Sequence, residues 1–168
     1  LPSPIDVQKF SRIGNVKKIE NQVAYVGRDS HEKGIDILKK AELQINGDVV
    51  YCIDRSWEDA MRVIKSSSVI VVPSRMESLP TVIKEAFYLN VPVVATNVGG
   101  IPELVVDNET GLLVPSENPE KIAYSVNELL SDTEKAKKLS RNGNDFVKKN
   151  MTWDVIFPKY IQFYKNLL

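Results

Sequence analysis

Residues 69–89 read Val-Ile-Val-Val-Pro-Ser-Arg-Met-Glu-Ser-Leu-Pro-Thr-Val-Ile-Lys-Glu-Ala-Phe-Tyr-Leu, which is an apolar run, a polar loop and an amphipathic stretch. A continuous run of β-branched residues is typical of a strand that is buried on both faces of a parallel sheet. Pro80 suits the first turn of a helix, and the amphipathic stretch predicts a helix over residues 81–89. The segment therefore predicts a strand, a loop and a helix in that order.

The same rhythm repeats along the chain. Similar apolar runs occupy residues 23–26, 49–53, 91–95 and 112–114, and helix-length stretches occupy residues 34–43 and 56–65, with a short one at 102–105. This alternation predicts an α/β fold with an open, doubly wound, Rossmann-like parallel sheet. Three further helices are expected at 119–130, 133–149 and 153–168, with a weak point at Gly143 and a kink or restart at Pro158.

Composition narrows the functional classes. The 168 residues carry 22 basic and 22 acidic side chains, so zero net charge removes the general electrostatic argument for nucleic-acid binding. Cys52 and His31 are the only residues of their types, which excludes an internal disulfide, a cysteine zinc cluster and a His-rich metal site. No apolar run approaches the roughly 20 residues of a membrane span, and no signal peptide is visible, so we expect a cytoplasmic location.

Ligands of open parallel sheets bind outside the carboxyl ends of the strands. The residues that follow the expected strands are Gly27-Arg28-Asp29, Asp54-Arg55, residues 73–77, residues 96–100 and Pro115-Ser116. Three of them are arginines, which predicts a local anion site in a neutral protein. The alternative is that each arginine pairs with an acid such as Asp29, Asp54 or Glu77.

The segment after the first strand fits a diphosphate. Gly27 allows a close turn, and Arg28 and Lys33 flank a helix N-terminus, which itself favours anions. A guanidinium binds phosphate in a bidentate manner, and an ammonium adds a point charge. The glycine spacing of Rossmann or P-loop fingerprints is absent.

The loop of residues 73–85 adds two carboxylates. Glu77 lies at the expected ligand edge, and Glu85 falls at the border of an apolar helix face, where a carboxylate needs hydrogen-bond partners. Vicinal sugar hydroxyls are suitable partners; the alternative is an ion pair with Lys84 or Lys121. The backbone amides expected to be free for an anion or hydroxyl are those of Ser78, Leu79, Thr81 and Val82.

Together these segments resemble a known family. The residues that carry the resemblance are Pro73-Ser74, Glu77, Glu85-Ala86, residues 91–96, Gly99 to Val105 and Thr110 to Pro115. They resemble the C-terminal, donor-binding domain of a retaining GT-B glycosyltransferase of family 4, the glycosyl transferases group 1, which includes many sucrose, mannosyl and polysaccharide synthases. The resemblance implies an interdomain linker at residues 1–20, a nucleotide-sugar-binding domain at 21–150 and a crossing helix at 151–168.

The resemblance also implies roles. Arg28 and Lys33 would bind the diphosphate of the sugar donor and stabilise the leaving nucleoside diphosphate, in place of a metal ion. Glu77 and the free amides would orient the donor sugar, Glu85 would hold the ribose hydroxyls, and the backbone at Ile53 and Asp54 would meet the base. Gly27 and Ser74 belong to the same donor site. No cofactor is implied beyond the UDP- or GDP-sugar substrate.

The acceptor lies elsewhere in this scheme. We expect a saccharide or lipid-linked acceptor to bind an N-terminal domain outside this chain, so that the chain alone does not complete catalysis. A basic stretch at residues 135–149 is expected to be a solvated helix face, or alternatively to contact the cytoplasmic face of an anionic membrane.

The chain departs from the family pattern at three places. Ser78 stands where glycine is usual, and Pro80 stands where glycine is frequent. Only a few residues separate Leu43 from Val49, where family members fit another strand and helix, which predicts a smaller sheet.

Other classes fit less well. A receiver-like signalling module needs an acidic cluster after the first strand, whereas this chain has Gly27-Arg28 there. A nucleotide-sugar epimerase and a non-catalytic nucleotide-binding module share the expected architecture and stay open as alternatives.

Overall fold

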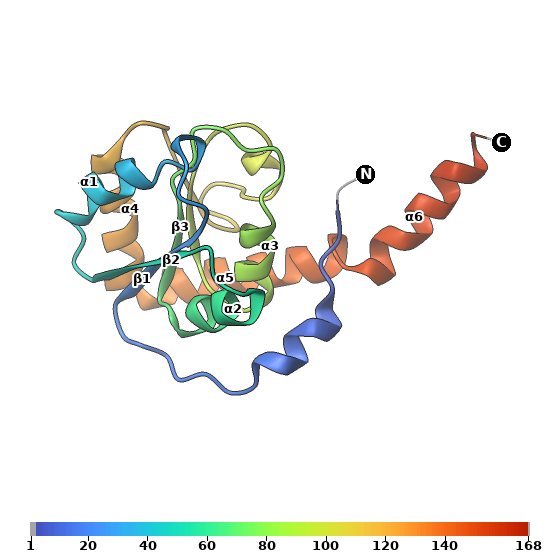
Figure 1. Ribbon diagram of the computed structural model, residues 1–168, viewed down its shortest axis with the longest axis horizontal. Coiled ribbons are helices and arrows are strands. Elements are labelled where there is room, and N and C mark those ends of the chain that lie inside the picture. Colours follow the sequence, from blue (N-terminus) through green and yellow to red (C-terminus); the bar gives the residue numbers. More distant parts are fainter. Residues whose placement is uncertain (1–2, 168) are drawn as a thin grey trace.

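The computed structural model describes residues 3–167 and contains a five-stranded parallel sheet between two layers of helices (Figure 1). The strand order is β2-β1-β3-β4-β5, and every neighbouring pair is parallel. The strands are β1 Gln22–Gly27, β2 Asp48–Ile53, β3 Val69–Val72, β4 Val93–Thr96 and β5 Leu112–Val114. This confirms the fold class and all five expected strands, with ends shifted by at most two residues.

The helices follow the expected order. They are α1 Ile35–Glu42, α2 Trp57–Ser66, α3 Thr81–Tyr88, α4 Pro119–Ser131, α5 Thr133–Asn150 and α6 Trp153–Lys165, with short 3₁₀ helices η1 Val7–Ile13, η2 His31–Lys33 and η3 Ile101–Glu103. The Asn118 and Asp132 side chains cap α4 and α5 by accepting hydrogen bonds from the amides three residues on. Residues 43–47 hold no further strand or helix, so β2 pairs directly with β1.

Two apolar clusters hold the layers together. Val23 and Tyr25 of β1 face one side and pack with residues of α1 and α4, whereas Ala24 faces the other side and packs with residues of α2 and α3. Residues along a strand point alternately to opposite faces, so each strand of β-branched residues serves both clusters. Burial on both faces explains why the apolar runs are continuous.

Gly143 is a packing position and not the expected weak point. Helix α5 is unbroken there, and a Cβ added at Gly143 would lie 2.6 Å from Cδ1 of Phe87 in α3. The next residue, Asn144, donates its side-chain amide to the carbonyl oxygens of Phe87 (3.1 Å) and Tyr88 (2.8 Å). The missing side chain therefore lets α5 approach the helix that carries Glu85.

The two ends of the described chain differ in their packing. Residues 3–13, which we call the N-terminal strap, bury Ile5 and Ile13 in the core, and the Ile5 amide donates to the Met151 carbonyl at 2.8 Å. Helix α6 instead projects from the body (Figure 1), and Ile156 is its one buried side chain within the described residues.

The projecting helix carries exposed apolar side chains, which are Trp153, Phe157, Ile161, Phe163 and Tyr164. It runs without interruption through Pro158, so the expected restart is wrong. Proline removes one helical hydrogen bond, and the surroundings of Pro158 are exposed, so water can reach the carbonyl that is left without a partner. None of the described helices has the length and apolar composition that crossing a bilayer requires.

Candidate functional site

The loops after β1 and β3 are held in close contact at the carboxyl edge of the sheet. Gly34 has φ +68°, and a Cβ there would lie 2.0 Å from the carbonyl oxygen of Pro73. The Arg75 amide donates to the Glu32 carbonyl at 2.7 Å, and Arg75 Nη1 donates to the His31 carbonyl at 2.8 Å. Glycine at position 34 thus permits an approach that any side chain would prevent.

This approach brings Lys33 and Glu77 together. Lys33 Nζ lies 2.5 Å from Glu77 Oε1, and the Ser74 hydroxyl donates to the same oxygen at 3.0 Å. Ser74 is buried, and its carbonyl accepts a hydrogen bond from the Thr96 hydroxyl at 2.6 Å. The Glu77 side chain is only 8% exposed, whereas that of Lys33 is 25% exposed. The ammonium keeps two further N–H groups for a ligand.

The arginines at this edge have different partners. Arg75 forms a bidentate ion pair with Asp36 (2.7 and 2.8 Å) and a second pair with Glu117. The hydrogen bonds from Arg75 lower the pKa of Asp36 to about 2. Arg75 is therefore paired with acids, as the alternative predicted, although with Asp36 and Glu117, and these pairs tie loops together. The side chains of Arg28 and Arg55 form no hydrogen bond or ion pair within residues 3–167, which leaves both available to an anion.

The loop before α3 presents its amides as expected. A Cβ at Gly99 would lie 1.8 Å from the Glu77 carbonyl oxygen, and the Gly100 amide donates to that oxygen at 3.2 Å, so the glycine pair fixes the peptide after Glu77. Helix α3 begins at Thr81, and Pro80 is its N-cap, one position earlier than the first turn. The predicted free amides are those of Ser78, Leu79, Thr81 and Val82, and none donates to a residue of the described chain.

Glu85 has a partner, but not one of the lysines considered. Its Oε1 accepts a hydrogen bond from Trp57 Nε1 at 2.8 Å. Burial raises the pKa of Glu85, against the opposing effects of the Trp57 N–H and the Lys84 charge. Lys84 itself is fully buried and donates to the Ser3 carbonyl at 2.7 Å and the Ser3 hydroxyl at 3.2 Å. Sequence reasoning missed both contacts, because each joins segments that are distant in the chain.

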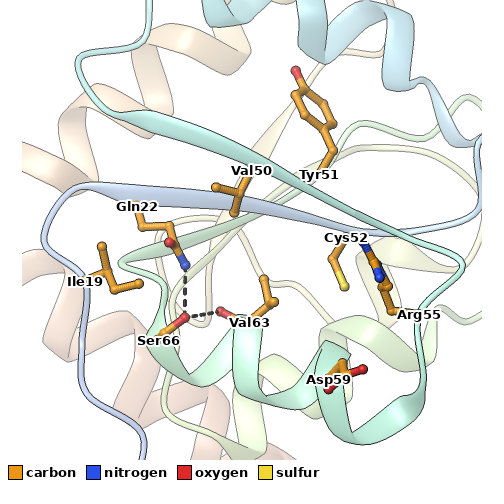
Figure 2. A pocket seen from close by; sticks show the side chains of 9 residues that line it. All are labelled: Ile19, Gln22, Val50, Tyr51, Cys52, Arg55, Asp59, Val63 and Ser66. Atoms are coloured by element: carbon orange, nitrogen blue, oxygen red, sulfur yellow. Dashed lines mark hydrogen bonds between the residues drawn. The ribbon is translucent and has the colours of Figure 1, made fainter.

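Two hollows lie between helix α2 and the strands β1 and β2, and Arg28 lines the smaller one. A pocket of about 230 Å³ is lined by residues that include Gly27, Arg28, Cys52, Asp54 and Arg55. A second pocket of about 380 Å³ follows β2 toward Gln22 (Figure 2), and Cys52 and Arg55 line both. Ile53 is half-buried and stands opposite Gly27 in the parallel register. The structure therefore brings Gly27, Arg28 and the residues after β2 to one place.

Two cations of the basic stretch in α5 already have acidic partners. Lys135 Nζ lies 2.5 Å from Glu128 Oε1, and Lys137 pairs with Glu134 at 3.3 Å. The remaining cations are Lys138, Arg141, Lys148 and Lys149. Residues 3–167 contain no group of three or more His, Cys, Asp or Glu side chains placed to hold a metal ion.

The chain is similar in sequence to proteins of one known family. The model of the family described as glycosyl transferases group 1 matches residues 39–146. A relative described as an uncharacterized glycosyltransferase, MJ1607 of Methanocaldococcus jannaschii, is 26% identical over 185 residues, which cover 93% of this chain and 47% of that protein. That alignment is longer than the 168-residue chain, so the relative carries residues that this chain lacks.

Solved structures share the fold. Sucrose-phosphate synthase from Thermosynechococcus elongatus superimposes with a TM-score of 0.83 and 27% identity, covering 98% of this chain and 49% of that one. The structure of Anabaena Alr3699/HepE in complex with UDP-glucose superimposes with a TM-score of 0.79 and 18% identity, covering 95% of this chain and 51% of that one. The chain thus spans about half the length of these proteins.

Proposed function

The chain belongs to the glycosyl transferases group 1 family, and on that premise we propose that it binds a nucleoside diphosphate sugar as the donor-binding domain of a GT-B glycosyltransferase. The observation that carries the proposal is the Lys33–Glu77 pair beside the unpaired Arg28, at the edge where parallel sheets bind ligands. The UDP-glucose complex of the structurally similar HepE supports the same class of ligand.

The cations act on the diphosphate. Arg28 donates to it through a guanidinium, Lys33 through the N–H groups that Glu77 leaves free, and the first-turn amides of α3 add uncharged N–H groups. These groups stabilise the negative charge that develops on the departing nucleoside diphosphate. In this proposal they supply the charge neutralisation that a metal ion provides in other transferases.

The carboxylates act on hydroxyls. Glu85 accepts hydrogen bonds from the ribose, and Glu77, held by Ser74 and Lys33, orients the donor sugar. The base lies near Ile53 and Asp54, in the pocket that Arg28 also lines. In this proposal the loops after β1, β2 and β3 and the helix α3 all contact one ligand.

The remaining parts of the reaction belong to a longer protein, since the relatives are about twice as long. We propose transfer with retention from a UDP- or GDP-sugar to a saccharide or lipid-linked acceptor bound by a second domain. The exposed apolar face of α6 packs on that domain. The free cations of α5 allow contact with the cytoplasmic face of a membrane.

Isothermal titration of the chain with UDP, GDP and their sugars tests the donor site. We expect binding of one base at sub-millimolar concentration, unchanged by EDTA. Glu85→Ala should weaken it by about 1–3 kcal/mol, whereas Glu120→Ala, an exposed acid on α4, should not. Absence of binding at millimolar ligand would contradict the proposal. In the longer protein, a product assay separates transfer from epimerisation or from binding alone.

A further inference from the structure

We infer that Trp57 is a positioning residue for Glu85, and this inference rests on the proposed binding of ribose by Glu85. Trp57 is the first residue of α2, and Glu85 lies in the middle of α3. The indole Nε1 donates to Oε1 at 2.8 Å, while Oε2 has no partner within residues 3–167. An indole N–H only donates, so it fixes one carboxylate oxygen and leaves the other open.

The indole is itself held by the N-terminal strap. The Phe10 ring meets the Trp57 ring edge to face, with centroids 5.0 Å apart and planes at 80°. Phe10 also lies 4.4 Å from the ring of Tyr88, three residues after Glu85 in α3. Phe10 is thus in contact with aromatic rings of both helices, and this contact limits the positions that the indole can take.

A second contact from the strap reaches the residue beside Glu85. The buried Lys84 ammonium donates to the carbonyl and hydroxyl oxygens of Ser3. Consecutive residues of α3 are therefore held by residues 3–13, Lys84 directly and Glu85 through Trp57. The positive charge of Lys84 also lowers the pKa of Glu85.

These contacts affect ligand binding because, in the proposed function, the half-buried Glu85 carboxylate binds the two ribose hydroxyls. Burial disfavours the charged form of Glu85, whereas the Trp57 N–H and the Lys84 charge favour it. In the charged form both oxygens only accept hydrogen bonds, and the bonds from hydroxyls are stronger than those to the protonated form, in which one oxygen carries a proton. A carboxylate fixed in advance also loses less conformational freedom when the ligand arrives. Trp57 therefore strengthens ribose binding without touching the ribose.

Trp57→Phe tests the inference, because it keeps an aromatic ring against Phe10 and removes the N–H. We expect a Kd about two- to tenfold higher for the nucleotide that the unsubstituted chain binds, which is the range for one lost hydrogen bond. The Kd of the 2′,3′-dideoxy form of that nucleotide should not change, and Trp57→Phe should have no further effect in a Glu85→Ala background. The matched control is Trp153→Phe, an exposed tryptophan on α6. Equal losses for the ribose and dideoxy nucleotides, or a full loss in the Glu85→Ala background, would overturn the inference.

A measurement without ligand separates this inference from the proposed function. The carboxyl ¹³C resonance of Glu85 is followed by NMR against pH in the parent, Trp57→Phe and Trp153→Phe chains. The midpoint should move to higher pH only in Trp57→Phe. If it moves while no nucleotide binds the parent, the donor site is wrong and the action of Trp57 on Glu85 stands. An unmoved midpoint overturns the inference whatever binds.

Discussion

Replacement of Gly34 by alanine should separate the two loops that place Lys33 beside Glu77. Position 34 has φ +68°, where an L-residue costs about 1–2 kcal/mol. The added Cβ would also stand 2.0 Å from the Pro73 carbonyl oxygen, so the loops must part by about 1 Å to reach the 3.0 Å that real contacts respect.

That displacement breaks backbone hydrogen bonds. The distance from the Arg75 amide to the Glu32 carbonyl would grow from 2.7 Å to about 3.7 Å, which is beyond hydrogen-bond range. The weaker bond from the Met76 amide to the same carbonyl, now 3.3 Å, would be lost as well. At about 1 kcal/mol for each bond, the free energy of unfolding should fall by about 3–4 kcal/mol in total.

Gly14 offers a control without a close contact. An added Cβ there would meet nothing within 4 Å, although its backbone (φ +61°, ψ −158°) lies in a region that is essentially restricted to glycine. Gly14→Ala should therefore show a conformational cost alone, about 1–3 kcal/mol. Guanidinium unfolding followed by circular dichroism gives both values. If Gly34→Ala lowers the free energy of unfolding by no more than the αL cost of about 1–2 kcal/mol, the close approach of the two loops does not carry the energy assigned to it.

Three further changes test other parts of the molecule. Gly143→Ala should destabilise by about 1–3 kcal/mol, because its Cβ would meet the Phe87 ring, and an unchanged denaturation midpoint would contradict this packing. Arg75→Gln should reduce the loss of stability that acid causes. The pKa of Asp36 is lowered from 3.8 to about 2, so the ion pair stabilises the unsubstituted chain above about pH 4, and this contribution is lost toward pH 2. Denaturation of both chains at several pH values measures the difference. Phe157→Ser should change the unfolding free energy by less than about 0.5 kcal/mol, since this side chain is 54% exposed; a larger loss in the same assay would mean that α6 packs on the body.

The sequence was sufficient to predict the sheet and the edge of the sheet at which the candidate site lies. Continuous β-branched runs have few alternatives to strands buried on both faces, and parallel strands place the residues that follow them at one edge. The position of Lys33 and Glu77 at one edge therefore follows from the parallel sheet, whereas their contact across 44 residues depends on the pairing of β1 with β3. The shortened connection before β2 was also visible, because a segment of that length holds no further element.

The partners of individual side chains could not be predicted in this way. An apolar contact of Trp57, such as that with Phe10, is common for a tryptophan, but its hydrogen bond to Glu85 depends on how α2 and α3 pack. Lys84 breaks the rule that lysines lie at the surface, because a carbonyl from the strap, 81 residues away, receives its ammonium. Arg75 likewise selects Asp36, an acid that becomes its neighbour only after the loops meet.

The two tryptophans sit in environments that spectroscopy can separate. Trp57 is half-buried between the strap and Glu85, whereas Trp153 is 48% exposed at the base of α6. The tryptophan fluorescence of the chain is therefore the sum of one emitter at the candidate site and one at the exposed helix. A chain with Trp153→Phe keeps a single indole, whose emission reports on the environment of Glu85, and a chain with Trp57→Phe keeps one that reports on whatever covers α6. The fold thus contains two optical probes, one for occupancy of the site and one for contact with another domain.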